Sequence, residues 1–292
     1  MPLNTAKSVA LKPLQDTQNT DAFMPSAERP VRVRSRHLPA DSHFEPHRHP
    51  WAQLAYCSSG VLQVTVLGAQ ETTSIVPSSR AVWIPPAAMH VVAVVEEAQF
   101  RSIYIDAQLL HFDKAQDWSK NRVITVSALL RELIHALGEA ATAVYEAKLH
   151  GSSQPESALR EQSLATLIAH EISAASTQSL GVPMPSQGGA DRRLRALCEA
   201  VIQRPAAHKT LAQWAGSVGM SERTAARLFK QELAMGFTQW RQQAVLAHAL
   251  PLLARGMPVG QVAPICGYDS VSAFTAMFKT ALGHAPGYFS EK

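Results

Sequence analysis

Hydrophobic residues between Val31 and Ile105 come in short runs that are separated by Pro, Gly and Ser. In Val61–Leu67 the apolar residues interleave with Gln63 and Thr65, which is close to the alternation of a half-buried strand. Similar short runs recur on either side of this segment: Gln53–Tyr56, Ala81–Ile84, Val91–Val95 and Phe100–Ile105. Such a series of strands predicts a small β-barrel or sandwich.

The hydrophobic spacing then becomes helical. Ser127–Leu149 places its apolar residues at i, i+1, i+4, i+5 and i+8: Leu129, Leu130, Leu133, Ile134 and Leu137. A second helix, Pro155–Ala175, carries a comparable set: Leu159, Leu164, Leu167, Ile168 and Ile172. These two helices either complete the core of the barrel or pair with a second subunit.

Two segments lack any periodicity. Residues 1–28 are polar and rich in turn formers, which predicts a poorly ordered leader. Residues 176–190 include STQSLGVPMPSQGG, whose Gly, Pro and Ser content predicts a linker. The expected organisation is therefore a leader, a domain at 29–175, a linker and a helical domain at 191–292.

The helical domain contains a short helix, a tight turn and a second helix. Thr210–Ser217 is the first helix, Gly219 marks the turn, and SERTAARLFKQE is the second helix. Ser221 is a suitable N-cap, although Thr224 stands where a capping box has Glu or Gln. Arg223 and Arg227 then lie one turn apart on the outer face. The pattern predicts a helix-turn-helix at about 210–232, whose second helix enters the major groove.

The same pattern occurs again at about 258–282. Pro258 opens the helix PVGQVAPICG at the N1 position, and Gly267-Tyr268-Asp269 forms the turn. The following helix, Ser270–Leu282, leaves four polar residues on its outer face: Ser270, Ser272, Thr275 and Lys279. Phe237–Arg255 reads as one connecting helix that Pro251 kinks or splits.

Charge separates the two halves of the chain. The 292 residues have a net charge of +4, which by itself says little about partners. Residues 191–292, however, hold 12 basic and 6 acidic side chains, whereas residues 1–190 hold 15 basic and 17 acidic ones. A basic excess confined to the helical domain indicates binding to nucleic acid.

The three cysteines form no CxxC pair, and no apolar stretch approaches the roughly 20 residues that span a bilayer. Odd and widely spaced thiols are typical of a reducing compartment. We therefore expect a cytoplasmic protein with no membrane partner.

The helical domain resembles the DNA-binding domain of the AraC/XylS family of bacterial transcription regulators. The resemblance rests on LAQWAGSVGMSERTAARLFKQE, on FTQWRQQAVLAHALPLLARG, and above all on VAPICGYDSVSAFTAMFKTALGHAPGYF. It implies seven helices, with two helix-turn-helix units joined by a long helix and set one DNA turn apart. The polar residues on the outer faces of the two second helices are the candidates for DNA contact: Ser221, Arg223, Thr224, Arg227, Ser270, Ser272, Thr275 and Lys279. Arg223 and Arg227 either read guanine edges or hold phosphates.

This chain departs from the family pattern at three places. Ala225 stands where Leu is usual, Ala234 where Gly is usual, and Val245-Leu246 where Arg-Leu is frequent. The missing arginine predicts one fewer phosphate contact.

The β-rich domain resembles a cupin, and a subgroup of AraC-like sensors with HxHxWxQL and RAVWIP phrases. His47-Arg48-His49-Pro50-Trp51-Ala52-Gln53, followed by Gly60, is similar to the first cupin motif, HxHxxxE with a later Gly. Pro85–His90 is similar to the second motif, PxGxxH, with Ala87 in place of Gly. In metal-binding cupins the three His and the Glu are the ligands, but Gln53 stands here for Glu and Val94 for a later Asn.

Three chemical interpretations of these histidines remain open. His47, His49 and His90 suit a divalent Zn, Fe, Ni or Cu ion, although Gln53 lacks the negative charge of a carboxylate. They also suit a metal-free effector pocket, or are core histidines with satisfied hydrogen bonds. The effector pocket would comprise His47, His49, Gln53, His90, Trp51, Tyr56 and Trp83, of which the aromatic residues also suit the core. The sequence establishes no cofactor, and a divalent transition metal in the barrel is the candidate that it leaves open.

Together these patterns predict a two-domain α+β protein: a cupin-like β-barrel with two following helices, then an all-α double helix-turn-helix domain. The predicted function is sequence-specific transcription regulation by a homodimer that responds to a small effector in the barrel and contacts RNA polymerase if it is an activator. The alternative is a metal-dependent cupin enzyme, a dioxygenase or isomerase, with an appended DNA-binding domain. Gln53 at the carboxylate position weighs against an enzyme.

Overall fold

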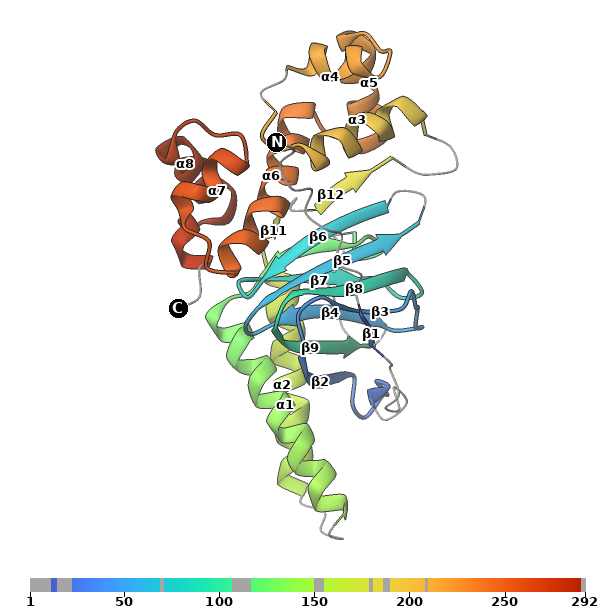
Figure 1. Cartoon of the computed structure of the whole chain (residues 1–292). Coiled ribbons are helices and arrows are strands. Elements are labelled where there is room, and N and C mark those ends of the chain that lie inside the picture. The colour runs from blue at the N-terminus through green and yellow to red at the C-terminus, as the bar shows by residue number, and fades with distance from the viewer. Residues whose placement is uncertain are drawn as a thin grey trace.

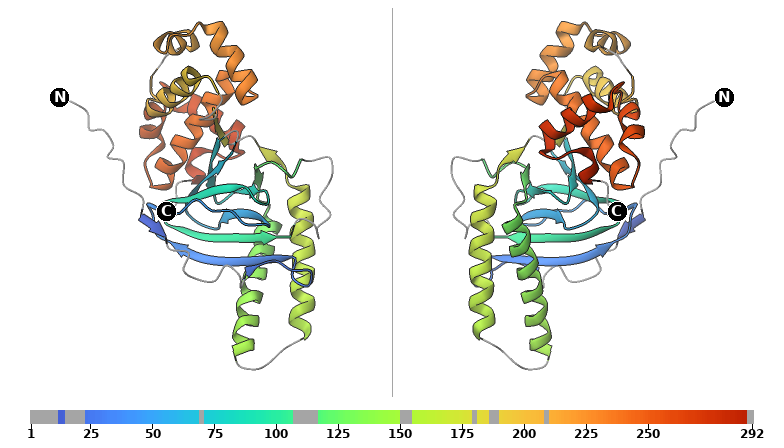
Figure 2. Two further views of the ribbon diagram at one scale, coloured as in Figure 1. Left: turned by 90° about the vertical axis from the view of Figure 1, so that its right-hand side faces the viewer. Right: turned by 90° about the vertical axis from the view of Figure 1, so that its left-hand side faces the viewer.

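The computed structural model describes residues 12–14, 23–68, 71–106, 117–149, 155–178, 181–185, 190–207 and 210–289. A β-sandwich with a long helical hairpin forms one part of the molecule, and a helical domain lies against the other side of the sandwich (Figure 1; Figure 2). The predicted fold class is confirmed.

Two six-stranded sheets make the barrel. The first has the order β1 (Lys12–Leu14), β3 (Ser42–Phe44), β8 (Met89–Glu96), β5 (Val61–Leu67), β6 (Glu71–Pro77) and β12 (Gly181–Met184). The second has the order β11 (Thr177–Gln178), β10 (Arg122–Thr125), β7 (Arg80–Ile84), β4 (Ala52–Cys57), β9 (Ala98–Ile105) and β2 (Val31–Leu38). The five runs predicted as strands lie within β4, β5, β7, β8 and β9.

Helices α1 (Ala128–Leu149) and α2 (Pro155–Ala174) cover the outer face of the second sheet. Their buried residues join that face in one apolar cluster: Leu130, Leu133, Ile134, Leu137, Ala165, Ile168 and Ile172. Three leucines predicted on the apolar stripes, Leu129, Leu159 and Leu167, are instead 53%, 68% and 49% exposed. The helices therefore complete the core with one face and leave leucines on the other, while the hairpin extends beyond the sheet (Figure 1).

Short strands occur in both segments predicted to lack regular structure. In the leader, β1 pairs in parallel with β3, whereas residues 1–11 and 15–22 lie outside the described residues. In the predicted linker, β11 pairs with β10 and β12 pairs with β6. These strands depend on backbone hydrogen bonds to distant partners, which a local hydrophobic pattern does not record.

The helical domain has six α-helices and one 3-10 turn among its described residues. They are α3 (Arg192–Gln203), α4 (Leu211–Ser217), α5 (Glu222–Leu233), α6 (Phe237–Ala254), α7 (Val259–Ile265), α8 (Val271–Leu282) and Pro286–Phe289. Both helix-turn-helix units are present as predicted. Pro251 does not split α6, and Pro258 is the N-cap of α7 rather than its first helical residue. Across the described residues, no helix has the length and apolar content to span a membrane.

The second helix-turn-helix unit, α7–α8, shares its core with the barrel. One apolar cluster runs from the barrel interior through α6 into α7 and α8, and α6 contacts β5, β6 and β8. Arg80 of β7 is 3% exposed, and its Nη2 donates to the carbonyl oxygen of Leu282 at the end of α8 (2.9 Å). At the end of α6, Arg255 pairs with Glu96 (3.0 Å) and Asp41 (3.4 Å) of the barrel.

The first unit, α4–α5, meets the barrel through the strand β12. Val182 and Met184 of β12 are buried in the apolar cluster that α3, α4, α5 and the first part of α6 share. The indole Nε1 of Trp240 donates to the carbonyl oxygen of Pro183 (2.8 Å). The segment predicted as a linker thus belongs to both domains.

Candidate functional sites

The two second helices of the helix-turn-helix units begin in the same way. The hydroxyl of Ser221 accepts from the backbone N–H of Thr224 (3.2 Å) at the start of α5. The hydroxyl of Ser270 accepts from the backbone N–H of Ala273 (3.3 Å) at the start of α8. The N-cap predicted for Ser221 is confirmed. Each cap satisfies one N–H group of the first turn and leaves the others available to an anion such as a DNA phosphate.

All eight residues predicted to contact DNA lie on these two helices or their caps. Thr224 and Thr275 are half-buried, and the other six are exposed: Ser221, Arg223, Arg227, Ser270, Ser272 and Lys279. The opposite faces are buried, with Leu228 and Phe229 in one unit and Phe274 and Phe278 in the other. Arg227 Nη1 donates to Gln231 Oε1 (2.5 Å), which holds its guanidinium over the outer face of α5.

Glycines with positive φ make the turns of both units. Gly219 has φ +71° between α4 and α5, and Gly267 has φ +78° between α7 and α8. A Cβ at Gly267 would lie 2.7 Å from the carbonyl oxygen of Pro205, so this turn excludes any side chain. The sequence also contains a capping box that the pattern analysis missed, in which Thr210 and Gln213 satisfy each other's backbone N–H at the start of α4.

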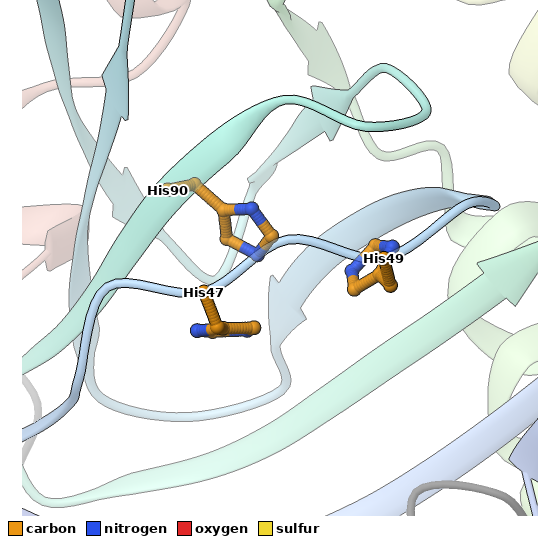
Figure 3. A group of neighbouring side chains, drawn as sticks. All are labelled: His47, His49 and His90. Atoms are coloured by element: carbon orange, nitrogen blue, oxygen red, sulfur yellow. The ribbon is translucent and has the colours of Figure 1, made fainter.

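Three histidines come together at one end of the barrel interior. His47 and His90 form a backbone bridge, with N–H to O distances of 3.0 and 2.9 Å, and their ring centroids are 4.3 Å apart. The ring of His49 is 5.2 Å from that of His90 (Figure 3). His47 and His49 lie on an irregular segment before β4, and the grouping of the three histidines is the one that the two cupin-like motifs imply.

Each of the three rings is held through its Nδ1. That atom lies 2.8 Å from the carbonyl oxygen of Glu45 in His47, 2.7 Å from that of Trp51 in His49, and 2.9 Å from that of Ala88 in His90. Because a carbonyl oxygen only accepts, each Nδ1 carries the proton and Nε2 is left with a lone pair. Metal-binding histidines are commonly oriented in this manner.

Burial keeps the inner two imidazoles neutral. It lowers the pKa of His90 to about 3, and it lowers the pKa of His49 against the opposing effect of a hydrogen bond accepted by Gln53 Oε1. One ring nitrogen of each histidine lies within 4.8 Å of the others. Neutral imidazoles with converging lone pairs fit a divalent transition metal such as Zn, Cu or Ni.

Gln53 lies between these rings. Its Oε1 is 2.9 Å from His49 Nε2 and 3.2 Å from His90 Nε2, while its Nε2 donates to the hydroxyl of Ser102 (3.2 Å). An oxygen facing two lone pairs is satisfied in one of two ways. Either the amide is turned so that its NH2 donates to both rings, or a cation lies between oxygen and nitrogens.

The aromatic residues predicted for the pocket are divided by the sheet. Trp51 stacks on His49, with centroids 5.2 Å apart and planes 7° apart, and Tyr104 contacts both rings. Tyr56 and Trp83 lie on the other face of the second sheet, in the cluster beneath α1 and α2. Assigning them to the pocket was wrong, because they occupy positions of opposite parity to the residues that face the interior.

A pocket beside the histidines contains residues that the sequence analysis did not select. Its lining comprises Arg36, Phe44, His47, Gln53, Val92, Phe100, Ser102 and Tyr104. Alternate residues of β9 supply three of these, and Arg36 comes from the paired strand β2. Only the pairing of β2 with β9 places Arg36 here.

Comparison with known proteins identifies both domains. Residues 30–169 match the model of the AraC-like ligand binding domain, and residues 214–292 match that of a helix-turn-helix domain. The HTH-type transcriptional regulator NimR of Escherichia coli is 32% identical over 243 residues, which are 83% of this chain and 81% of NimR. The arabinose operon regulatory protein of Salmonella typhimurium is 30% identical over 114 residues, 38% of each chain.

Among solved structures, ToxT from Vibrio cholerae O395 is 12% identical and has a TM-score of 0.36 over 89% of this chain and 96% of ToxT. That likeness is too distant to bear on function. NimR matches most of its own length and of this chain, and the two family models cover the barrel and the double helix-turn-helix. The chain therefore belongs to the AraC family of transcription regulators and carries the ligand-binding domain of that family.

Proposed function

We propose that this regulator reads its operator with the N-terminal halves of α5 and α8 and binds a small effector among the barrel histidines. The observation that carries the DNA half is the repetition of one arrangement: a serine N-cap, exposed polar residues after it, and an apolar face beneath. Effector binding then shifts the population between two presentations of the DNA-binding helices. Residues 29–175 act as sensor, 176–190 connect, and 191–292 bind DNA.

Arg227 provides the sharpest test of the DNA contacts. Arg227→Ala weakens binding of the full chain to its operator by about 1–3 kcal/mol if the guanidinium reads a base edge. Lys230→Ala is the matched control, since Lys230 is exposed in the last turn of α5, away from its N-terminus. Genome-wide mapping supplies the operator, and titration with operator and random duplex supplies both affinities.

The outcome on random DNA assigns the contact. A loss confined to the operator assigns Arg227 to base reading, and an equal loss on random DNA assigns it to phosphate. Operator affinity falls steeply as salt rises because phosphate contacts release counterions. A flat salt response contradicts the electrostatic part of the proposal.

The effector site is tested in the barrel. Contacts between their side chains join His47, His49, Gln53, His90 and Trp51, and two of them, His47 and Gln53, line the pocket. His47→Ala combined with His90→Ala abolishes the change in operator affinity that cell extract or effector produces. His135→Ala is the control, because His135 is an exposed histidine of α1. A response that persists in the double variant places the effector elsewhere.

A bound metal is a second candidate for the same site, favoured by the three Nδ1 anchors and by the oxygen of Gln53. His47, His49 and His90 would hold it, and it would supply a fixed positive charge to an effector. Elemental analysis of the purified full-length protein measures the number of metal ions bound per chain. The His90→Ala variant is the reference, because it lacks one of the three proposed ligands. Metal without substrate turnover supports a sensor that is not an enzyme, whereas stoichiometric iron with turnover supports a cupin enzyme.

We further propose that the protein acts as a homodimer in the cytoplasm and contacts RNA polymerase when it activates transcription. The exposed leucines Leu129, Leu159 and Leu167 on the helical hairpin support pairing with a second copy. Sedimentation of Leu159→Lys against the wild type tests this, because a charge there opposes an apolar interface. A variant that remains a dimer removes the hairpin from the interface.

A further inference from the structure

The second helix of the second helix-turn-helix unit begins with an exposed apolar side chain. Val271 is the first residue of α8 and is 45% exposed, between the exposed Ser270 and Ser272. Within the described residues of α5 and α8, no other large apolar side chain is exposed to that extent. The core of the unit is made instead by Phe274 and Phe278, which are both 0% exposed. Val271 therefore lies largely outside the core, at the end of the helix that meets base edges in a helix-turn-helix.

Aligning the two second helices on their serine N-caps shows how differently their outer faces are built. Ser221 then matches Ser270, and the buried Phe229 matches the buried Phe278. Three charged residues of α5 match neutral residues of α8: Glu222 matches Val271, Arg223 matches Ser272, and Arg227 matches Ala276. All six of these side chains are exposed. The two helices therefore share a buried face and differ in the chemistry of the face toward solvent.

Charge separates the two units in the same way. Residues 191–233, which include the first unit, hold 8 basic and 4 acidic side chains, a net charge of +4. Residues 258–289, the second unit and the 3-10 turn after it, hold one of each, Lys279 and Asp269. Lys279 is in the last turn of α8, away from the end that meets base edges. Attraction to phosphates therefore belongs mainly to the first unit, and the second unit recognises its half-site largely through uncharged groups.

The four bases differ in the side chains that recognise them in the major groove. Guanine is read by Arg or Lys, adenine by Asn or Gln, and cytosine by Asp or Glu, whereas thymine presents a C5-methyl group to apolar side chains. Residues 271–277 of α8, VSAFTAM, include none of the first three kinds. Serine and threonine hydroxyls bond to more than one base and so do not select one. Contact between Val271 and a thymine methyl group, in contrast, is selective and removes two apolar groups from water.

We propose that Val271 contacts the C5-methyl group of a thymine in the half-site bound by α8, and so determines the base preference of the second unit. This inference rests on the proposed reading of the operator by α5 and α8, and it adds the base that α8 selects. The operator is then asymmetric. Charged side chains of α5 meet one half-site, and a methyl contact selects thymine in the other.

Replacing thymine by uracil tests the methyl contact, because it removes the C5-methyl group and leaves base pairing unchanged. The duplex is the operator supplied by genome-wide mapping, and the loss of protection in Arg227→Ala identifies the half-site of α5. Deoxyuridine replaces every thymidine of one half-site at a time, and the affinity of the full chain is measured for each duplex. Uracil in the α8 half-site weakens binding about fourfold for each contacted methyl group, the factor for burying one CH2 group. The same replacement in the α5 half-site controls for the effect of uracil on the duplex itself.

Substitutions of Val271 assign the contact to this side chain. Val271→Ala binds the thymine and uracil duplexes equally, whereas Val271→Thr, which keeps one methyl group, retains part of the preference. Ile202→Ala is the matched control, because Ile202 is 41% exposed on α3, outside both second helices, and this variant keeps the full preference. Circular dichroism verifies that each variant is folded, as the exposure of both residues leads us to expect.

Three results overturn the inference. They are a loss of affinity in the α8 half-site no larger than in the α5 half-site, a preference for thymine that Val271→Ala retains in full, and a mapped operator whose α8 half-site contains no thymine. Binding of the wild type to the unmodified operator is measured first. A protein that binds the operator and treats thymine and uracil alike loses only this inference, whereas one that binds no operator loses the proposed function itself.

Discussion

The two helix-turn-helix units have the same pattern of residues but are completed by different parts of the molecule. The first unit closes its core with α3 and with two side chains of β12. The second unit continues its core into the barrel, and Arg80 of β7 donates to the last carbonyl of α8. The second unit is therefore packed more closely on the barrel than the first unit.

Two buried leucines test whether the shared core transmits instability. Leu253 of α6 belongs to the cluster shared with the barrel, and Leu197 of α3 belongs to the cluster of the first unit; both are 0% exposed. Each Leu→Ala substitution lowers the free energy of unfolding by about 2–5 kcal/mol. Leu253→Ala also accelerates amide hydrogen exchange in β5, β6 and β8, whereas Leu197→Ala leaves exchange in these strands unchanged. If both variants accelerate exchange in these strands equally, the difference between the two units is contradicted.

Arg80 tests the polar connection. Arg80→Met removes a charged donor from the carbonyl of Leu282 and lowers the free energy of unfolding by about 1.5–3 kcal/mol. Arg80→Lys restores part of this. Arg101→Met is the control, because Arg101 donates to Phe100 within the barrel. For Arg80→Met, footprinting on the operator is expected to show weaker protection only at the half-site that α8 binds. Equal weakening at both half-sites would contradict a specific role for Arg80.

The ends of α5 and α8 provide a matched pair of substitutions with opposite signs. Ala234 ends α5 with φ +56°, and Gly283 ends α8 with φ +78°. Ala234→Gly raises the free energy of unfolding by about 1 kcal/mol because glycine adopts this conformation without strain. Gly283→Ala lowers it by about 1 kcal/mol through strain alone, since a Cβ there meets nothing within 4 Å. In the double variant the two changes cancel, so its free energy of unfolding, measured by urea denaturation, is close to that of the wild type.

Arg255 gives the smallest effect. Its ion pairs with Glu96 and Asp41 are solvated, with 47% of the arginine side chain exposed. Arg255→Gln therefore changes the free energy of unfolding by about 0–1 kcal/mol. The change disappears at about 1 M salt, where such pairs are screened. If Arg255→Gln still changes the free energy of unfolding at high salt, the contribution of Arg255 comes from its hydrogen bond to the carbonyl oxygen of Val95.

The sequence predicted those elements whose pattern is local. Periodicity located α1 and α2 to within one residue at each end, and turn glycines and N-caps located both helix-turn-helix units. It did not locate β12, because Gly181–Met184 is a strand only through its pairing with β6 and its burial beneath Trp240.

The site was predicted only in part, for a related reason. The histidines lie in recognisable motifs, and their convergence follows from the fold that those motifs imply. Tyr56 was misplaced although parity held the answer, since it is three positions from Gln53 and so faces the other side of β4. Arg36 needed more than parity, because only the pairing of β2 with β9 places it on the lining of the same pocket as Gln53.

Strand β12 also restricts how the first helix-turn-helix unit is held. Val182 and Met184 point into the unit, and the strand is hydrogen-bonded in register to β6. A slip by one residue would turn both side chains away from the unit. The register between β12 and β6 therefore fixes where the first unit sits on the barrel.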